Sequence, residues 1–143
     1  MTITNEQRRI VRERAEYCCE YCRVAESDRL STFHIDHIIA LKHDGTDDTD
    51  NLCFACYKCN GYKGSNVAGL DPETNEASKL YHPRQQQWDD HFQINNDGTL
   101  AGKTPEGRVT INILRINSPE RVKPRHIALQ IGEYPCGLND IER

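Results

Sequence analysis

The chain has few aromatic side chains and no long apolar run. Aromatic residues make up 7% and hydrophobic residues 36% of its 143 residues, which predicts a small core. A small core is often stapled by a metal ion or a disulfide. Because no stretch of about 18 apolar residues occurs, the sequence predicts no membrane-spanning helix. The first residues lack the basic and apolar segments of a signal peptide, so the expected location is the reducing cytoplasm.

The sequence also lacks an excess of basic residues. It has 18 Lys and Arg against 22 Asp and Glu, a net charge of −4, and neither half is a basic tail. A DNA-binding protein usually presents a basic patch, so composition alone argues mildly against a nucleic-acid partner. A bound divalent cation would add positive charge that the sequence does not count, and basic residues can cluster in space.

Cysteine is well represented, with seven residues, an odd number that leaves at least one outside any pairing. Cys19-x2-Cys22 and Cys56-x2-Cys59 form two knuckles. Each knuckle can bring two thiolates to one ion, and two knuckles complete a tetrahedron. In a reducing compartment such close pairs indicate zinc more often than disulfides. The sequence therefore predicts a structural zinc site.

Polar residues between and after the knuckles offer hydrolytic chemistry. Asp36 and His37 would lie on opposite faces of a strand, so a strand end or bend is needed before both reach one site. The oxygens of Asp36 and Asn60 suit Mg²⁺ or Mn²⁺ better than zinc. A histidine titrates near neutral pH and suits a general base. Lys63 shares a helix face with Asn60 and can meet a phosphate as a point charge.

Hydrophobic spacing and turn signals predict a sequence of short elements. A helix is expected over about 5–17, with Thr4 as its cap and Gln7 completing a capping box. A strand follows over 30–35 and can continue to 41, before a second strand at 51–56 and a short helix from about 57 to 64. The second half is expected to contain a turn at 71–76, a strand at 88–94, a hairpin turn at 95–98 with a return at 99–103, a helix over 105–117 stopped by Pro119, and an ambiguous tail over 120–143.

Four short segments follow one another along the chain, and they are Cys19–Cys22, Ile35–Ile39, Asp50–Leu52 and Cys56–Gly64. In sequence and in order they resemble the HNH endonuclease family, whose fold is the ββα-metal fold. The resemblance covers roughly residues 17–66. The type it resembles carries zinc knuckles. More loosely, the later runs at 80–84, 88–92 and 104–108 resemble a subgroup of small, stand-alone bacterial HNH proteins.

The resemblance implies the fold class and the organisation of the chain. An α+β protein is expected, with a ββα-metal HNH core stapled by a four-cysteine zinc site, an N-terminal helix and a C-terminal hairpin-plus-helix extension. The chain would be a single HNH nuclease domain over 1–143, with its core at 17–66 and the extension at 67–143. The function of the extension does not follow from the resemblance.

The resemblance also implies a role for each matching position. Asp36 would bind a catalytic Mg²⁺ or Mn²⁺, Asn60 would be its second protein ligand, and His37 would be the general base. Asn51 would hold the loop and the backbone of His37. The structural zinc ligands would be Cys19, Cys22, Cys56 and Cys59. The candidates for substrate contact are His34, Lys63 and Arg84.

The cysteine register depends on this comparison, since spacing alone also allows Cys18 in place of Cys19 and the pair Cys53-x2-Cys56. By comparison with the family, Tyr21 and Asn60 favour the register chosen above. The remaining cysteines are then expected to be small buried hydrophobes. They are Cys18, Cys53 and Cys136. Two departures from the common family pattern are Asn60, where many members have His, and Asp44-Gly45, where Gly-Gly is frequent.

The predicted function is that of a metal-dependent endonuclease that hydrolyses DNA and leaves a 5′-phosphate and a 3′-hydroxyl. The alternative is a catalytically idle, zinc-stapled module that binds nucleic acid or protein, which the acidic pI of about 5.8 favours. An RNase ranks lower because the sequence has no aromatic and basic platform for single strands. DNA is the expected partner, and the oligomeric state stays open between a monomer and a weak dimer.

Overall fold

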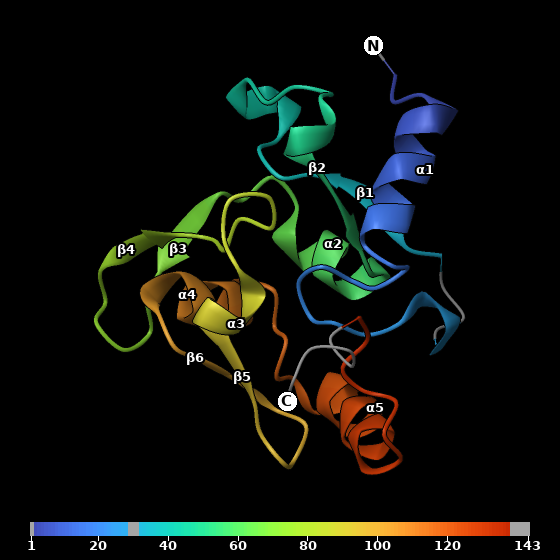
Figure 1. Ribbon diagram of the computed structural model, residues 1–143. Helices are drawn as coiled ribbons and strands as arrows, with labels where there is room; N and C mark the ends of the chain where they lie inside the picture. The colour runs from blue at the N-terminus through green and yellow to red at the C-terminus, as the bar shows by residue number, and fades with distance from the viewer. Residues whose placement is uncertain (1, 29–31, 138–143) are drawn as a thin grey trace.

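The computed structural model describes residues 2–28 and 32–137 (Figure 1). Within them the helices are α1 (Asn5–Arg14), α2 (Tyr57–Lys63), α3 (Trp88–His91), α4 (Pro105–Ile113) and α5 (Pro119–Gln130). The strands are β1 (His34–His37), β2 (Leu52–Ala55), β3 (Ala68–Leu70), β4 (Ala77–Lys79), β5 (Phe92–Ile94) and β6 (Leu100–Gly102). They form three separate two-stranded antiparallel sheets, so the predicted α+β class is confirmed.

Helix α1 starts as the sequence predicts but ends earlier. The Thr4 hydroxyl accepts a hydrogen bond from the Gln7 amide, and the Gln7 side chain accepts one from the Thr4 amide. The helix stops at Arg14 rather than near residue 17 because Glu16 and Tyr17 adopt positive φ angles of 57° and 62°. This left-handed pair cannot continue a right-handed helix, and it turns the chain into the first knuckle.

The unit formed by β1, β2 and α2 lies at the centre of the fold. Strand β1 pairs with β2, and the chain then passes through Cys56, the N-cap of α2, into the helix. Helix α1 packs against both strands and buries Val11 completely. In Figure 1, β3 to α4 lie on the opposite side of α2 from α1. Of the first predicted strand, residues 30 and 31 lie outside the described residues.

The second half agrees with the predictions in part. The hairpin turn at 95–98 is present, between β5 and β6. The strand expected over 88–94 is wrong in its first half, where residues 88–91 form α3 and only 92–94 are extended. The acidic pair Asp89 and Asp90 stands in the first turn of α3, where it favours the helix. The helix predicted over 105–117 ends earlier, at Ile113, so Pro119 does not stop it. Pro119 is instead the first residue of α5, because proline lacks only an amide that the first turn leaves free.

One cluster of buried side chains connects the two halves and runs from Val11 to Tyr134. Two hydrogen bonds join the C-terminal extension to the first knuckle. The indole of Trp88 donates to the Tyr21 carbonyl at 2.8 Å, and the Tyr134 hydroxyl donates to the Cys22 carbonyl at 2.7 Å. The extension therefore packs directly on the knuckle. Among the described residues no helix is long and apolar enough to cross a membrane.

Candidate functional site

The hairpin and α2 bring three of the predicted site residues to one pocket. Strand β1 ends at His37, and this supplies the strand end that adjacent Asp36 and His37 require to reach one site. Together with Asn60 from α2 they line an open pocket of about 270 Å³. Ile35, Ala40, Leu41, Gly64 and Ser65 complete its wall. The pocket is open to solvent and has room for a hydrated ion and a phosphate.

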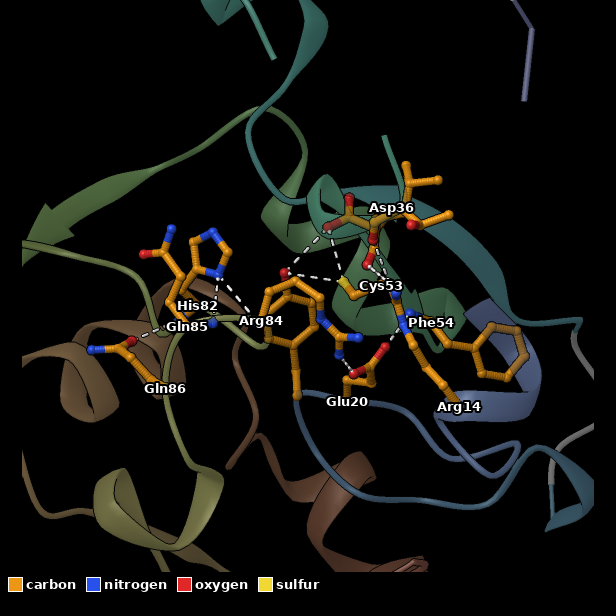
Figure 2. A network of polar contacts seen from close by, with 12 residues as sticks. Arg14, Glu20, Asp36, Cys53, Phe54, His82, Arg84, Gln85 and Gln86 are labelled. Atoms are coloured by element: carbon orange, nitrogen blue, oxygen red, sulfur yellow. Dashed lines mark hydrogen bonds and ion pairs between the residues drawn. The ribbon is translucent and has the colours of Figure 1, made fainter. Parts of the chain in front are cut away.

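Asp36 is buried, with one carboxylate oxygen held by three groups. Its Oδ2 accepts a hydrogen bond from the Tyr21 hydroxyl at 3.2 Å. It also accepts one from the Cys53 thiol at 3.6 Å (Figure 2). The Lys63 ammonium lies 3.1 Å from the same oxygen. Burial raises the pKa of the Asp36 carboxyl, while the Lys63 charge and these hydrogen bonds act in the opposite direction. Among the described residues no hydrogen bond engages Oδ1, and Asp36 is one of the residues that line the pocket.

His37 is paired with an acidic residue that the sequence analysis did not single out. Its Nε2 lies 2.8 Å from Oδ1 of Asp47, and both side chains are mostly covered. When the ring is neutral and Asp47 is ionised, this contact requires the ring proton on Nε2 and leaves Nδ1 as an acceptor, because a carboxylate then only accepts hydrogen bonds. The sequence offered only a weak signal, an Asp in the polar loop between the two strands.

The loop that carries Asp47 is folded tightly by its backbone. Asp44 adopts a left-handed φ of 68°, and a Cβ on Gly45 would lie 1.7 Å from the Ile39 carbonyl oxygen. Glycine is therefore required at position 45, although Asp is tolerated at 44 in place of the frequent first glycine. This close approach turns the loop back over the end of β1.

Asn51 fastens the same loop. Its side-chain amide donates to the carbonyls of Ile39 at 2.9 Å and Thr46 at 2.8 Å, and its Oδ1 accepts from the Ile39 amide at 2.9 Å. Its backbone carbonyl also accepts from the Ile38 amide at 2.8 Å, directly after His37. These contacts fix the loop between the two strands, and the positioning role expected of Asn51 in catalysis stays a prediction.

The four knuckle cysteines form a buried cluster whose Sγ atoms all lie within 4.8 Å of one another. The Sγ atoms of Cys22 and Cys56, one from each knuckle, are 3.8 Å apart. A tetrahedral Zn–S bond of about 2.3 Å requires S···S separations of about 3.8 Å, so the cluster fits a zinc ion. The amides of Cys22 and Cys59 point at the sulfurs of Cys19 and Cys56 at 3.5 and 3.4 Å. The cluster therefore has the donors and the geometry of a metal site.

The other cysteines differ in part from the prediction. Cys53 is a free and fully buried thiol, as expected. Cys18 and Cys136 form a disulfide, so the expectation that they are unpaired hydrophobes is wrong. They are separated by 118 positions, and no spacing rule connects residues so far apart. The amide of Cys136 also donates to the Arg23 carbonyl at 2.9 Å. The disulfide thus ties the C-terminal end of the described chain to the segment just before the first knuckle.

Two of the predicted substrate contacts are turned inward. Lys63 is only 1% exposed, and its ammonium donates to the His37 carbonyl at 3.0 Å besides pairing with Asp36. Arg84 forms an ion pair with buried Glu20, whose other oxygen accepts from the amide of Phe54 (Figure 2). Burial lowers the pKa of the Arg84 guanidinium to about 10.

The third predicted substrate contact, His34, is exposed at the start of β1. Its ring lies 6.1 Å from the ring of Tyr57, centroid to centroid, and Tyr57 is itself exposed at the start of α2. His34 does not line the pocket that Asp36, His37 and Asn60 share. Of the three predicted substrate contacts, His34 is exposed, Arg84 is partly buried and Lys63 is buried.

A β-hairpin followed by a helix, with an Asp–His pair at the end of the first strand and an asparagine on the helix, defines a ββα-metal domain. The HNH endonuclease family model matches residues 19–66, and this segment belongs to that family. The chain is 28% identical to Septu protein PtuA of Bacillus mycoides (strain KBAB4) over 103 residues, which cover 65% of this chain and 14% of that protein. No solved structure matches the chain.

Proposed function

We propose that this protein is a metal-dependent DNA endonuclease. The observation that carries the proposal is the shared pocket of Asp36, His37 and Asn60, with His37 backed by Asp47. An idle binding module, the alternative, has no need of a histidine whose tautomer is fixed or of a carboxylate with one free oxygen. DNA is favoured as the substrate by membership of the HNH family; the net charge of −4 gives it no separate support.

The donor set at the pocket suits a hard divalent cation. Oδ1 of Asp36 and the amide oxygen of Asn60 would hold Mg²⁺ or Mn²⁺, and the open pocket leaves room for the waters that Mg²⁺ retains. A bound ion would supply Lewis acidity to the scissile phosphate and stabilise the leaving oxygen. Lys63, Tyr21 and Cys53 would fix the carboxylate so that its free oxygen faces the ion.

His37 would act as the general base through Nδ1. The water proton moves to Nδ1 as the water oxygen bonds to phosphorus, and the bond from phosphorus to the 3′ oxygen breaks. The 3′ oxygen then takes a proton from solvent, which gives a 5′-phosphate and a 3′-hydroxyl. Asp47 would hold the ring orientation and stabilise the positive charge that His37 gains, as a carboxylate partner does for other histidine bases.

The four-cysteine cluster would hold structural zinc. All four sulfurs are buried, so no position is open to substrate, as is typical of structural rather than hydrolytic sites. The ion would bind the first knuckle, which follows α1, to the second, which begins α2. Zinc binding would then contribute directly to folding.

Cleavage of supercoiled plasmid tests the proposal. We expect nicked DNA with Mg²⁺ or Mn²⁺ and none with EDTA. His37→Ala should abolish nicking while zinc content and thermal stability stay close to wild type. His43→Ala, a histidine exposed in the same loop, is the matched control and should nick normally. Wild-type protein that binds DNA but leaves it intact with every divalent ion would establish the binding module instead.

A further inference from the structure

The four-cysteine cluster has one more neighbour, which comes from the C-terminal extension. Arg121, in the first turn of α5, is only 6% exposed. Its Nη2 donates to the sulfur of Cys59 at 3.0 Å and approaches that of Cys56 at 3.8 Å. Its Nη1 donates to the Leu114 carbonyl at 2.6 Å, which fixes the guanidinium in this orientation. Among the described residues no carboxylate forms an ion pair with Arg121.

The charge of the cluster explains why a cation belongs there. Four thiolates around one Zn²⁺ leave a net charge of about −2 in a buried site. Burying such a charge is costly unless it is paired and hydrogen-bonded. Backbone amides supply two hydrogen bonds to the sulfurs but no positive charge. The guanidinium of Arg121 supplies both a charge and a donor.

A second buried arginine on the same face of α5 provides a contrast. Arg125, one turn later, is 1% exposed. Its guanidinium donates only to neutral oxygens, the carbonyls of Gly98 and Ile116 and the side chain of Asn117. Arg125 thus has the hydrogen-bonding pattern of a structural residue. Arg121, in contrast, directs its guanidinium at the thiolates.

We propose that Arg121 is the counter-ion of the four-cysteine zinc site, and that α5 thereby becomes part of that site. The inference rests on the zinc occupancy proposed above. The C-terminal extension, residues 67–143, would then supply the positive charge that neutralises the negative charge of the metal centre between the two knuckles. Loss of the metal should in turn loosen the contact between α5 and the knuckles.

Zinc affinity, measured by competition with a coloured chelator, tests the role of Arg121. Outer partners of metal ligands typically change affinity by about 10- to 100-fold. We expect Arg121→Met to weaken zinc binding by about this factor and Arg121→Lys, which keeps the charge, to restore part of it. Arg125→Met is the matched control for burying a methionine on the same helix face, and it should leave zinc affinity unchanged.

The outcomes separate the two proposals. Wild-type protein that contains no zinc would overturn the proposed cofactor itself. If the wild type contains zinc but Arg121→Met binds it as tightly as wild type does, the cofactor stands and the role of Arg121 is refuted. Equal weakening in Arg125→Met and Arg121→Met would also refute it, because the loss would then reflect a general loosening of α5.

A measurement on the unaltered protein covers the case in which Arg121→Met does not fold. Exchange of zinc for ¹¹³Cd should give scalar coupling between the metal and a guanidinium proton of Arg121, transmitted through the N–H···S bond to Cys59. Observation of this coupling supports the proposal. A well-resolved guanidinium resonance without coupling would overturn it.

Discussion

The buried pair of Lys63 and Asp36 supports the most direct test of how the site is built. The side chains are 2% and 7% exposed, and the charged atoms are 3.1 Å apart. At an effective dielectric constant of about 20, their attraction is about 5 kcal/mol. Removal of one partner of a buried pair leaves the other charge uncompensated and typically costs about 3–5 kcal/mol. A domain of this size has a total stability of about 5–15 kcal/mol, so the loss is a large fraction of the whole.

We therefore expect Lys63→Met to lower the free energy of unfolding by about 3–5 kcal/mol. The second variant, Asp36→Asn, removes the opposite charge, and the double variant should recover much of the loss because no unpaired charge remains buried. Urea unfolding at constant zinc concentration, followed by the helical circular dichroism signal, gives all four corners of this cycle. Lys58→Met, on the exposed side of α2, is the control and should change stability by less than about 0.5 kcal/mol.

Two results would refute this reasoning. A loss below about 1 kcal/mol in Lys63→Met would mean that the pair behaves as an exposed one. A double variant as unstable as the sum of the two single variants would mean that the residues do not interact. Either result would also remove the basis for regarding Lys63 as the residue that holds Asp36 beneath the pocket.

Three further predictions follow from single contacts. Asp47→Asn should lower the cleavage rate by about 10²- to 10⁴-fold without unfolding, because His37 loses its tautomer control, and plasmid nicking against an Asp48→Asn control checks it. Burial lowers the pKa of His82. The contribution of His82 to stability should therefore be full above about pH 6.5 and should be lost as the pH drops through the pKa that His82 has in the folded protein. Thermal melts of His82→Asn should lack this pH dependence. Cys136→Ser should cost up to about 5 kcal/mol, and reduction of the wild type should reproduce the loss in urea.

Local sequence rules identified the candidate site residues that the structure brings together but not the groups that contact them. Asp36, His37 and Asn60 could be found because each stands at a fixed offset within a short motif, and the structure places all three at one pocket. Asp47 belongs to a loop whose path depends on the left-handed Asp44 and on the contact of Gly45 with Ile39. No periodicity in the sequence specifies that path.

Inward-facing charges explain the other differences. Lys63 and Arg84 were expected at the surface because charged side chains are rarely buried. Lys63 is buried and Arg84 is partly buried, and each forms an ion pair with a carboxylate, Asp36 for Lys63 and Glu20 for Arg84. Composition cannot reveal such pairing, since Arg84 and its partner are 64 positions apart. The same applies to the disulfide between Cys18 and Cys136, which are 118 positions apart.

Tyr21 in the first knuckle contacts Asp36 of the proposed catalytic pocket, and Asn60 beside the second knuckle lines it, so metal binding and the proposed function would be linked. Tyr21, between the first two cysteines, donates to Asp36, while Glu20 bonds to the β2 backbone at Phe54. Asn60 directly follows the last cysteine of the cluster. Movement of the knuckles would therefore displace Asp36 and Asn60 together. Removal of the metal from the four-cysteine cluster should abolish cleavage even when Mg²⁺ is abundant. Zinc returned alone to the metal-free protein should not restore cleavage until Mg²⁺ or Mn²⁺ is also present.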